Sequence, residues 1–258
     1  MAAAAGARLT PVCASALDAL PDIGAGDDLA ALIASAAPSR LADGDVIVVA
    51  HKVVSKAEGR VRVLADVEPG ERALELASEH GKDPRLVQVV LDESAELVRA
   101  HGGVLIARTR HGFVCANAGV DQSNASHPGE VVLLPEDPDA SARRLRAGIA
   151  AARGVRPAVV VSDSFGRPWR LGQTDVAIGV AGLAPLDDWG GRPDAFGRDL
   201  SVTAIAVADA AAAAADLARG KDSRRPAVLL RGLESHVSAD DGPGAAALLR
   251  EPEQDLFR

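Results

Sequence analysis

Short apolar runs rich in β-branched residues alternate along this chain with longer runs of helical character, and this alternation limits the possible fold. Residues 46–50 (VIVVA), 158–161 (AVVV) and 227–230 (AVLL) have the composition of buried strands. The runs between them are long enough for helices that pack on a sheet. The pattern predicts an α+β fold with mixed sheets and packed helices.

Three helical runs carry start and stop signals, in residues 26–38, 139–154 and 207–220. Asp or Ser before an apolar run favours a helix start, whereas Gly or Pro favours its end. The expected boundary residues are Asp27 or Asp28 and Pro38 for the first helix, Asp139 or Ser141 and Gly154 for the second, and Gly220 for the Ala-rich third.

Other segments are less regular. We expect β-type structure to continue from residue 50 through Val53 and Val54, and the strand of PAVVVSD to end at Asp163. Residues 71–99 look mostly helical, and residues 104–121 resemble a hairpin that turns at His111 and Gly112. A short helix is expected at residues 245–249. No short-period repeat and no obvious linker interrupt the chain, so we predict one domain over residues 1–258. A two-lobed organisation with its division near residues 135–138 fits this prediction.

Composition excludes several functional classes. A net charge of -8, no Tyr, four Phe and two Trp argue against a general nucleic-acid binder, which needs a basic face or aromatic platforms. An acidic protein can still bind a nucleotide through local cations. Cys13 and Cys115 lack the spacing of a disulfide framework or a zinc site. With no apolar run of membrane-span length and no signal-like start, we expect a cytoplasmic protein that does not bind a membrane.

The sequence contains no P-loop motif (GxxxxGKS/T), no dinucleotide-binding motif (GxGxxG) and no hydrolase motif of the type GxSxG. Any nucleotide site must therefore be unusual. The segment SDSFGRPWRLGQTD, residues 162–175, is the richest in polar groups. Asp163 beside the Ser164 hydroxyl is a reasonable site for a hard cation. Arg167 and Arg170 offer forked donors for phosphate or carboxylate. The alternative is a polar turn in which Asp163 caps the backbone.

Three further clusters contain candidate residues, each with a plain structural alternative. Asp121 and Asn124 could place two ligands on one turn, or form an Asx-turn. Lys52 and Lys56 could meet phosphate, or lie on a solvated face. Lys221 follows the helix that ends at Gly220, where a basic group also suits the helix dipole.

In this order the segments closely resemble one family, coenzyme F420-0:L-glutamate ligase, also called F420:gamma-glutamyl ligase. The resemblance covers almost the whole chain, and its longest blocks are specific. The matching stretches are GDDLAALI, GDVIVVAHKVVSKAEGR, NAGVDQSN, LLPEDPDASARRLR, SDSFGRPWRLGQTDVAIGVAGLAPL, VTAIAVADAAAAAADLARGK and DLF.

The resemblance implies a reaction and its partners. GTP would phosphorylate the terminal carboxylate of F420-0, and the amine of L-glutamate would attack the acyl phosphate; later rounds would add gamma-linked glutamates. Two divalent metal ions, Mg or Mn, would bridge the triphosphate and the acceptor carboxylate, which repel each other. K+ is a further candidate cofactor. An intertwined homodimer is also implied. Some relatives continue into a flavin-binding domain about where this chain stops.

The resemblance also assigns roles to individual residues. Asp121 and Asp163 would bind a divalent ion, with the Ser164 hydroxyl beside a second one. Together with Arg167 and Arg170, the two aspartates form the predicted catalytic group. The residues implied in GTP binding are Leu20, Pro21, Asp22, Ile23, His51, Lys56, Asn124, Gly220 and Lys221. A protonated lysine cannot bind a metal, so Lys221 would contact phosphate or act through its backbone.

Two alternatives stay open at this point. The chain could be a carboxylate–amine ligase of the same fold that uses another acceptor, because the sequence does not show which residues form the acceptor pocket. It could also be a non-catalytic module that binds F420 or a nucleotide. The retention of Asp121, Asp163, Asn124 and Lys56 argues against the second alternative.

Overall fold

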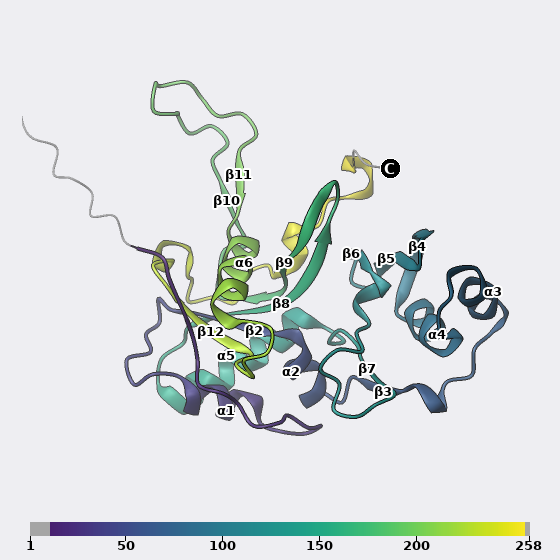
Figure 1. The fold of residues 1–258 in the computed structure, drawn as a ribbon. Helices are drawn as coiled ribbons and strands as arrows, with labels where there is room; N and C mark the ends of the chain where they lie inside the picture. The colour runs from purple at the N-terminus through teal and green to yellow at the C-terminus, as the bar shows by residue number, and fades with distance from the viewer. Residues whose placement is uncertain (1–10, 256–258) are drawn as a thin grey trace, which may run out of the picture.

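The computed structural model describes residues 11–255, and its centre is a five-stranded mixed sheet (Figure 1). Strands β2 and β8 are parallel, and the other neighbours in the sheet are antiparallel. This arrangement confirms the predicted α+β class. The strands, in their order across the sheet, are β1 (Cys13–Ala16), β12 (Ala227–Arg231), β2 (Val46–Ala50), β8 (Ala158–Arg167) and β9 (Arg170–Ala181).

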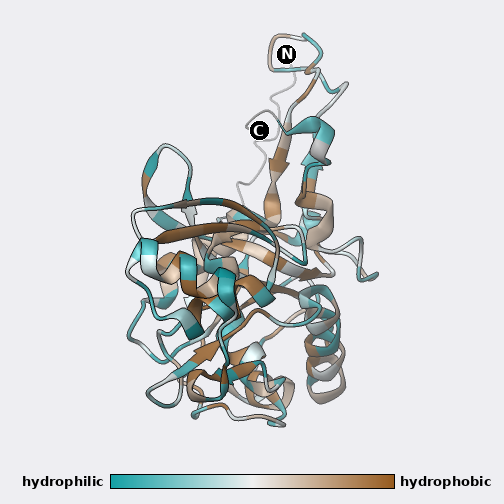
Figure 2. Ribbon diagram, turned by 90° about the vertical axis from the view of Figure 1, so that its right-hand side faces the viewer, coloured by the Kyte–Doolittle hydropathy of each residue, from teal (hydrophilic) through white to brown (hydrophobic). Residues whose placement is uncertain are grey.

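Helices cover both faces of this sheet. Helices α1 (Leu29–Ala36) and α5 (Pro138–Arg153) pack on one face, and α6 (Val207–Arg219) packs on the other. Alternate residues of β2 point to opposite faces, so Ile47 and Val49 join one core while Val46 and Val48 join the other. Burial on both faces explains why the central strands read as continuous apolar runs (Figure 2).

A third hydrophobic core lies in a smaller lobe. It is built from helices α3 (Glu71–His80) and α4 (Pro84–Asp92) and the strands β4 (Ser94–His101), β5 (Val104–Thr109) and β6 (Val114–Ala116). In Figure 1 this lobe lies beside the main sheet, beyond β3 and β7. Leu133 belongs to the small core and Leu134 to the main one, just before the predicted division at residues 135–138. That the chain is a single domain stays a prediction.

The remaining elements are short. Strands β3 (Val61–Val63) and β7 (Glu130–Val132) connect the lobes, and β10 (Leu186–Asp188) and β11 (Ala204–Ala206) form a protruding arm (Figure 1). No helix within residues 11–255 is both long and apolar enough to cross a bilayer. The short helical segments are α2 (His51–Ala57) and the 3-10 turns Leu64–Asp66, Asn117–Gly119, Glu234–His236, Ala245–Leu248 and Pro252–Gln254.

The helix ends agree with the sequence in all but one respect. Asp28 caps α1, and Gly154 and Gly220 follow the last residues of α5 and α6. The predicted caps of α5, however, are wrong, because Asp137 accepts the N–H of Ala140. Asp139 instead accepts the N–H groups of Val180 and Ala245, and so ties the helix to the sheet.

Two secondary-structure predictions are wrong, and a third holds only in part. Residues 51–57 form helix α2 because His51, Val54 and Ser55 lie one turn apart and are buried together. Residues 71–99 are mostly helical, as predicted, in α3 and α4, but their end from residue 94 belongs to strand β4. Strand β8 does not end at Asp163 but continues to Arg167, because β9 pairs with it along the whole length.

Candidate active site

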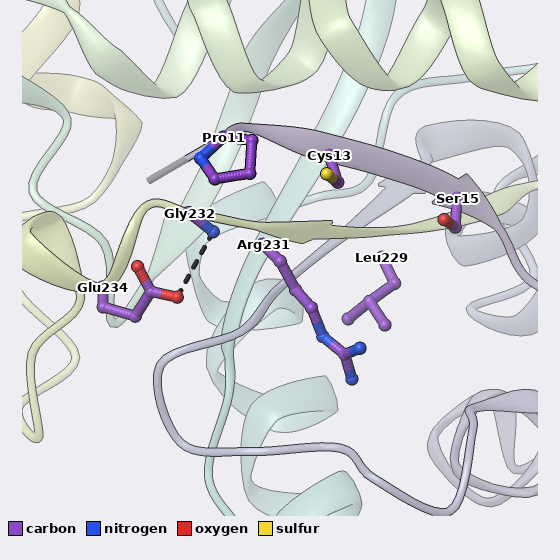
Figure 3. Close-up of a pocket in the computed structure, with 7 residues that line it drawn as sticks. All are labelled: Pro11, Cys13, Ser15, Leu229, Arg231, Gly232 and Glu234. Carbon is purple, nitrogen blue, oxygen red and sulfur yellow. Dashed lines mark hydrogen bonds between the residues drawn. The ribbon is translucent and has the colours of Figure 1, made fainter. Parts of the chain in front are cut away.

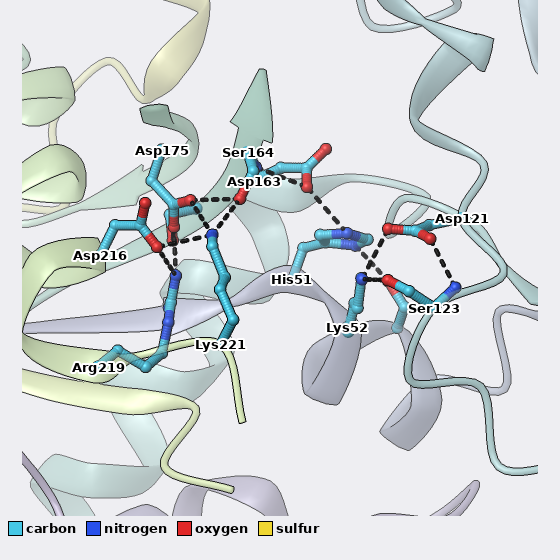
Figure 4. Close-up of polar contacts among 12 residues, drawn as sticks. His51, Lys52, Asp121, Ser123, Asp163, Ser164, Asp175, Asp216, Arg219 and Lys221 are labelled. Atoms are coloured by element: carbon cyan, nitrogen blue, oxygen red, sulfur yellow. Dashed lines mark hydrogen bonds and ion pairs between the residues drawn. The ribbon is translucent and has the colours of Figure 1, made fainter. Parts of the chain in front are cut away.

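The first two residues of α2 contact two carboxylates that are far away in sequence (Figure 4). His51 Nε2 lies 3.2 Å from Asp163 Oδ1, and Lys52 Nζ lies 2.6 Å from Asp121 Oδ2. The parallel pairing of β2 with β8 sets Ala50 beside Ser162, which places the start of α2 next to Asp163. Both predicted metal ligands are therefore held at the same end of one short helix.

His51 is buried, with its Nδ1 atom 3.3 Å from the hydroxyl of Ser55. Its Nε2 atom is close to Asp163, but the angle does not give a hydrogen bond, so this buried nitrogen has no aligned partner. Asp163 also accepts the N–H of Ser164. The site therefore contains one buried nitrogen, His51 Nε2, that lacks a hydrogen-bond partner among the described residues.

Asp121 lies in the Asx-turn that the sequence left open as an alternative. Its Oδ1 atom accepts the N–H of Ser123 at 2.6 Å, while the Lys52 ammonium donates to the Ser123 hydroxyl. Burial raises the pKa of the Asp121 carboxyl, but the Lys52 ammonium and the Ser123 N–H together lower that pKa below its ordinary value. Asp121 is therefore anionic at neutral pH.

Ser164 is paired in the hairpin with Asp175, a buried carboxylate. Asp175 accepts hydrogen bonds from the hydroxyls of Ser162 at 2.7 Å and Ser164 at 2.6 Å, and forms a short ion pair with Arg219. Burial raises the pKa of Asp175, but the Arg219 charge and the two hydroxyls lower it below its ordinary value. This carboxylate thus fixes the orientation of both hydroxyls.

Lys221 reaches the same cluster from the end of α6. Gly220 adopts a positive φ of 68° directly after the helix, and Lys221 follows it. The Lys221 ammonium lies 2.9 Å from Ser164 Oγ and 2.7 Å from Asp216 Oδ1. A single network therefore joins β8, β9 and α6.

Arg167 and Arg170 are not brought to these carboxylates. Arg167 follows Asp163 by four residues along an extended strand, a separation of about 13 Å. Its guanidinium donates to the carbonyl of Leu171 within the hairpin, and Arg170 is exposed nearby. Their predicted catalytic role is not supported by any contact with Asp121 or Asp163.

The residues predicted to bind GTP lie in four places: helix α2, the loop of residues 20–23, the turn that contains Asn124, and the end of α6. Lys56 is in the last turn of α2, and its ammonium makes no ion pair or hydrogen bond within residues 11–255. Gly26 N–H donates to Ala57 O, which sets the preceding loop beside that turn. In this loop Leu20 and Ile23 are buried, whereas Pro21 and Asp22 are exposed. Asn124 is also exposed, with a positive φ of 58°.

The donor set suits one hard cation better than a closed metal site. Among the described residues, no group of three or more His, Cys, Asp and Glu side chains is placed to hold a metal ion. Asp121 and Asp163 offer carboxylate oxygens, and Mg2+ commonly takes one or two carboxylates with phosphate oxygens, whereas the Ser164 hydroxyl, the third predicted ligand, contacts the Lys221 ammonium. The residues therefore fit an ion whose other ligands come from a bound phosphate and water.

From the sequence alone Asp175 was one further polar group of the segment 162–175 and had no assigned role, and Asp216 and Arg219 were not singled out. A signal was nevertheless present, because Asp209, Asp216 and Arg219 are the only charged residues of the Ala-rich helix before its end. Spacings of three and seven place them along one face of α6. Asp209 accepts the N–H of Ala177 at the irregularity between β8 and β9, so this face is the one that packs on the sheet.

The two thiols take no part in the network. Cys13 is exposed and Cys115 is buried, and neither forms a disulfide, as the sequence predicted. Burial, with the nearby Asp163 charge, raises the pKa of Cys115 to about 12. This thiol is therefore neutral and unreactive at physiological pH.

A hollow of about 350 Å³ lies elsewhere, at the β1–β12 edge (Figure 3). Its polar side chains are already used by the fold, since Arg231 pairs with Asp45 and Glu234 accepts the N–H of Gly232. The hollow contains none of the predicted site residues. It offers no alternative centre for the chemistry.

Comparison with known sequences identifies the family. The sequence model of F420-0:Gamma-glutamyl ligase matches residues 19–232. The chain belongs to the F420-0:gamma-glutamyl ligase family. The match includes every residue predicted to act in the site, from Leu20 to Lys221, and it confirms the resemblance read from the sequence.

Curated relatives of this ligase family cover nearly the whole chain. The coenzyme F420:L-glutamate ligase of Methanothermobacter thermautotrophicus is 46% identical over 247 residues, 94% of this chain and 97% of the relative. The coenzyme F420:L-glutamate ligase of Methanopyrus kandleri is 48% identical over 235 residues, 90% of this chain and 92% of the relative. That of Methanocaldococcus jannaschii is 44% identical, over 84% of this chain and 85% of the relative. The chain is thus an enzyme of a ligase family.

Proposed function

We propose that this chain joins the amine of L-glutamate to the terminal carboxylate of F420-0 in a GTP-dependent reaction. GTP phosphorylates the carboxylate, the glutamate amine attacks the acyl phosphate, and GDP and phosphate leave. Further rounds add gamma-linked glutamates. The observation that carries this proposal, beside family membership, is the placement of Asp121 and Asp163 at one end of α2, against the Lys52 ammonium and the His51 ring.

The chain's own residues supply anions for a divalent ion and cations for phosphate. Asp121 and Asp163 would hold Mg2+ or Mn2+, which, when bound, neutralises charge that develops between nucleotide and acceptor. Lys52 now neutralises Asp121 at 2.6 Å. With Asp121 holding such an ion, the Lys52 ammonium would be available to a phosphate oxygen.

The nucleotide would lie along α2. The unpaired Lys56 ammonium is a natural partner for a phosphate. The loop that contains Leu20, Pro21, Asp22 and Ile23 is attached beside the helix through Gly26 and Ala57. Asn124 follows Asp121 by three residues, Gly220 precedes Lys221, and His51 is buried beside Asp163.

Arg167 and Arg170 would bind substrate anions from the hairpin. The Arg170 side chain is exposed and makes no ion pair within residues 11–255, so its guanidinium is free for a carboxylate or phosphate. Arg167 needs only to release the Leu171 carbonyl to do the same. A guanidinium suits this role because it binds such groups in a bidentate way.

A homodimer is also part of the proposal. The β10–β11 arm projects from the body of the protein, and Phe196, Val202 and Ile205 on it are exposed (Figure 1). An isolated two-stranded hairpin is only marginally stable, and exposed apolar side chains favour contact with another surface. A second copy would cover them. Light scattering after gel filtration tests this, and a monomer at micromolar concentration would contradict it.

The reaction is tested by product mass. Purified protein is incubated with F420-0, L-glutamate, Mn2+ and either GTP or ATP at equal concentration, and Asp163→Asn serves as a matched inactive control. We expect glutamylated F420 and GDP with GTP only. Ligation with ATP alone would remove the GTP assignment. Nucleotide binding without any product would favour a binding module, and GDP release with a different acid in place of F420-0 would favour another acceptor.

A further inference from the structure

One ammonium group of the chain lies within a set of oxygen atoms that resembles a cation site (Figure 4). Lys221 Nζ is 2.9 Å from Ser164 Oγ, 2.7 Å from Asp216 Oδ1 and 3.7 Å from Asp175 Oδ1. A hydroxyl and two carboxylates are oxygen donors of the kind that a hard divalent ion uses. Here the cation among them belongs to the chain itself.

The hydrogen bonds of Ser164 show how this cation is held. A serine hydroxyl has one hydrogen and two lone pairs. The hydrogen is directed to Asp175 Oδ1 at 2.6 Å, so a lone pair is left to accept from the Lys221 ammonium. Asp175 therefore presents the Ser164 oxygen to Lys221, and a metal ion that bound this oxygen would have to displace the lysine.

The local charges also sum to zero, so no net negative charge is left to attract a divalent ion at this position. Asp175 and Asp216 carry two negative charges, and Arg219 and Lys221 carry two positive ones. Arg219 contacts Asp175 Oδ2 closely and lies 3.6 Å from Asp216 Oδ1, while Lys221 lies 2.7 Å from that same Asp216 oxygen and 3.7 Å from Asp175 Oδ1. An added divalent ion would meet a neutral cluster and two nearby cations that repel it.

The other carboxylates of the site differ in this respect. Asp121 is paired with the Lys52 ammonium, whereas Asp163 lies against the buried His51 ring and forms no ion pair with a lysine or arginine within residues 11–255. A net negative charge is therefore available there for one ion. The two halves of the site thus call for different cations.

We propose that Lys221 is a built-in cation that takes the place of a second divalent ion, so that each protomer binds one divalent ion together with the nucleotide. The Lys221 side chain is 65% exposed, so its ammonium can also contact a phosphate oxygen from the solvent side. This proposal rests on the proposed function, because it concerns the cations of that same site.

The test counts bound ions rather than turnover. Wild-type protein, Lys221→Gln, Lys221→Arg and Arg225→Gln are each saturated with Mn2+ and guanosine 5′-[β,γ-imido]triphosphate. After gel filtration, manganese per protomer is measured by elemental analysis. Arg225 is an exposed basic residue four positions away whose side chain makes no ion pair within residues 11–255, so it is a matched control.

We expect one Mn2+ in wild type, Lys221→Arg and Arg225→Gln, and two in Lys221→Gln, whose amide oxygen can bind metal. Two ions in wild type would overturn this proposal and leave the proposed reaction intact. One ion in a folded Lys221→Gln would overturn it as well, since the lysine would not be what excludes the second. No manganese in any protein would contradict the metal-dependent reaction itself. Melting curves show whether each variant is folded. If Lys221→Gln fails to fold, the number of manganese ions per wild-type protomer decides the proposal by itself.

Discussion

Ser164 and Asp175 face each other across the β8–β9 hairpin, and the serine Oγ donates a 2.6 Å hydrogen bond to Oδ1 of the buried carboxylate. The two residues are direct partners in the strand register, so the backbone sets their spacing. Arg219 closes the other side of Asp175. Removing the charge of Asp175 should therefore affect both stability and the orientation of the Ser164 hydroxyl.

Asp175→Asn should destabilise the protein by about 3 kcal/mol at neutral pH, because the nearly buried Arg219 loses its main partner and keeps only Asp216 at 3.6 Å. The pKa of Asp175 is lowered in the folded protein, so the stability it contributes is present above its unfolded value of 3.8 and is lost as pH falls through the lower folded value. The difference in unfolding free energy between wild type and variant should thus shrink below about pH 4. Urea unfolding at several pH values measures it, and a constant difference would contradict the assignment.

Asp121→Asn and Asp163→Asn should each reduce ligation on the order of 10³-fold or more, since each removes a charge that a hard cation needs. The Asp121 side chain is 40% exposed, so losing its ion pair with Lys52 should cost no more than about 1 kcal/mol of stability. Glutamate-dependent GDP release and melting temperature separate the two effects.

Asp28→Asn is the matched control for both substitutions. Asp28 caps α1 by accepting the N–H of Ala31, and asparagine caps a helix equally well. Turnover and melting temperature should therefore match wild type. Near wild-type turnover in Asp121→Asn or Asp163→Asn would show that this aspartate has only a structural role, in its turn or strand.

Lys56→Ala should raise the KM for GTP, because a charge-assisted contact with phosphate contributes about 1.5–3 kcal/mol, or about 10- to 150-fold. Melting temperature should hardly change, since the Lys56 ammonium has no partner within residues 11–255. Lys82→Ala provides the comparison, because Lys82 lies between α3 and α4 in the small lobe. Unchanged kcat and KM in Lys56→Ala would favour a solvated lysine.

Gly179→Ala should destabilise the protein by about 1–3 kcal/mol through overpacking. A Cβ at Gly179 would lie 2.2 Å from the carbonyl oxygen of Pro138, so the start of α5 would have to move away from β9. Gly166→Ala, further along the same hairpin, meets no atom within 4 Å and should leave the unfolding free energy almost unchanged. Equal urea midpoints for the two variants would show that α5 adjusts freely.

Local patterns were sufficient for much of the architecture. The apolar runs at β2 and β12, the hairpin of β5 and β6, and the helices α1, α5 and α6 are where propensity and the start and stop signals place them, apart from the N-cap of α5. Short, strongly patterned segments depend little on distant contacts, which is why these predictions hold. The family could also be identified from the sequence, because the long blocks around Lys56 and Asp163 match that family specifically.

Tertiary contacts decided the rest. Val53 and Val54 favour a strand locally, yet they lie in α2 because burial of His51, Val54 and Ser55 on one side outweighs propensity. Asp163 is not at a strand end because β9 continues to pair with β8. The pairing of Ser164 with Asp175, and of Lys221 with both Ser164 and Asp216, joins segments up to 57 residues apart. Ionic and hydrogen-bond partners at such separations follow from strand register and helix packing, which composition and spacing along one chain do not encode.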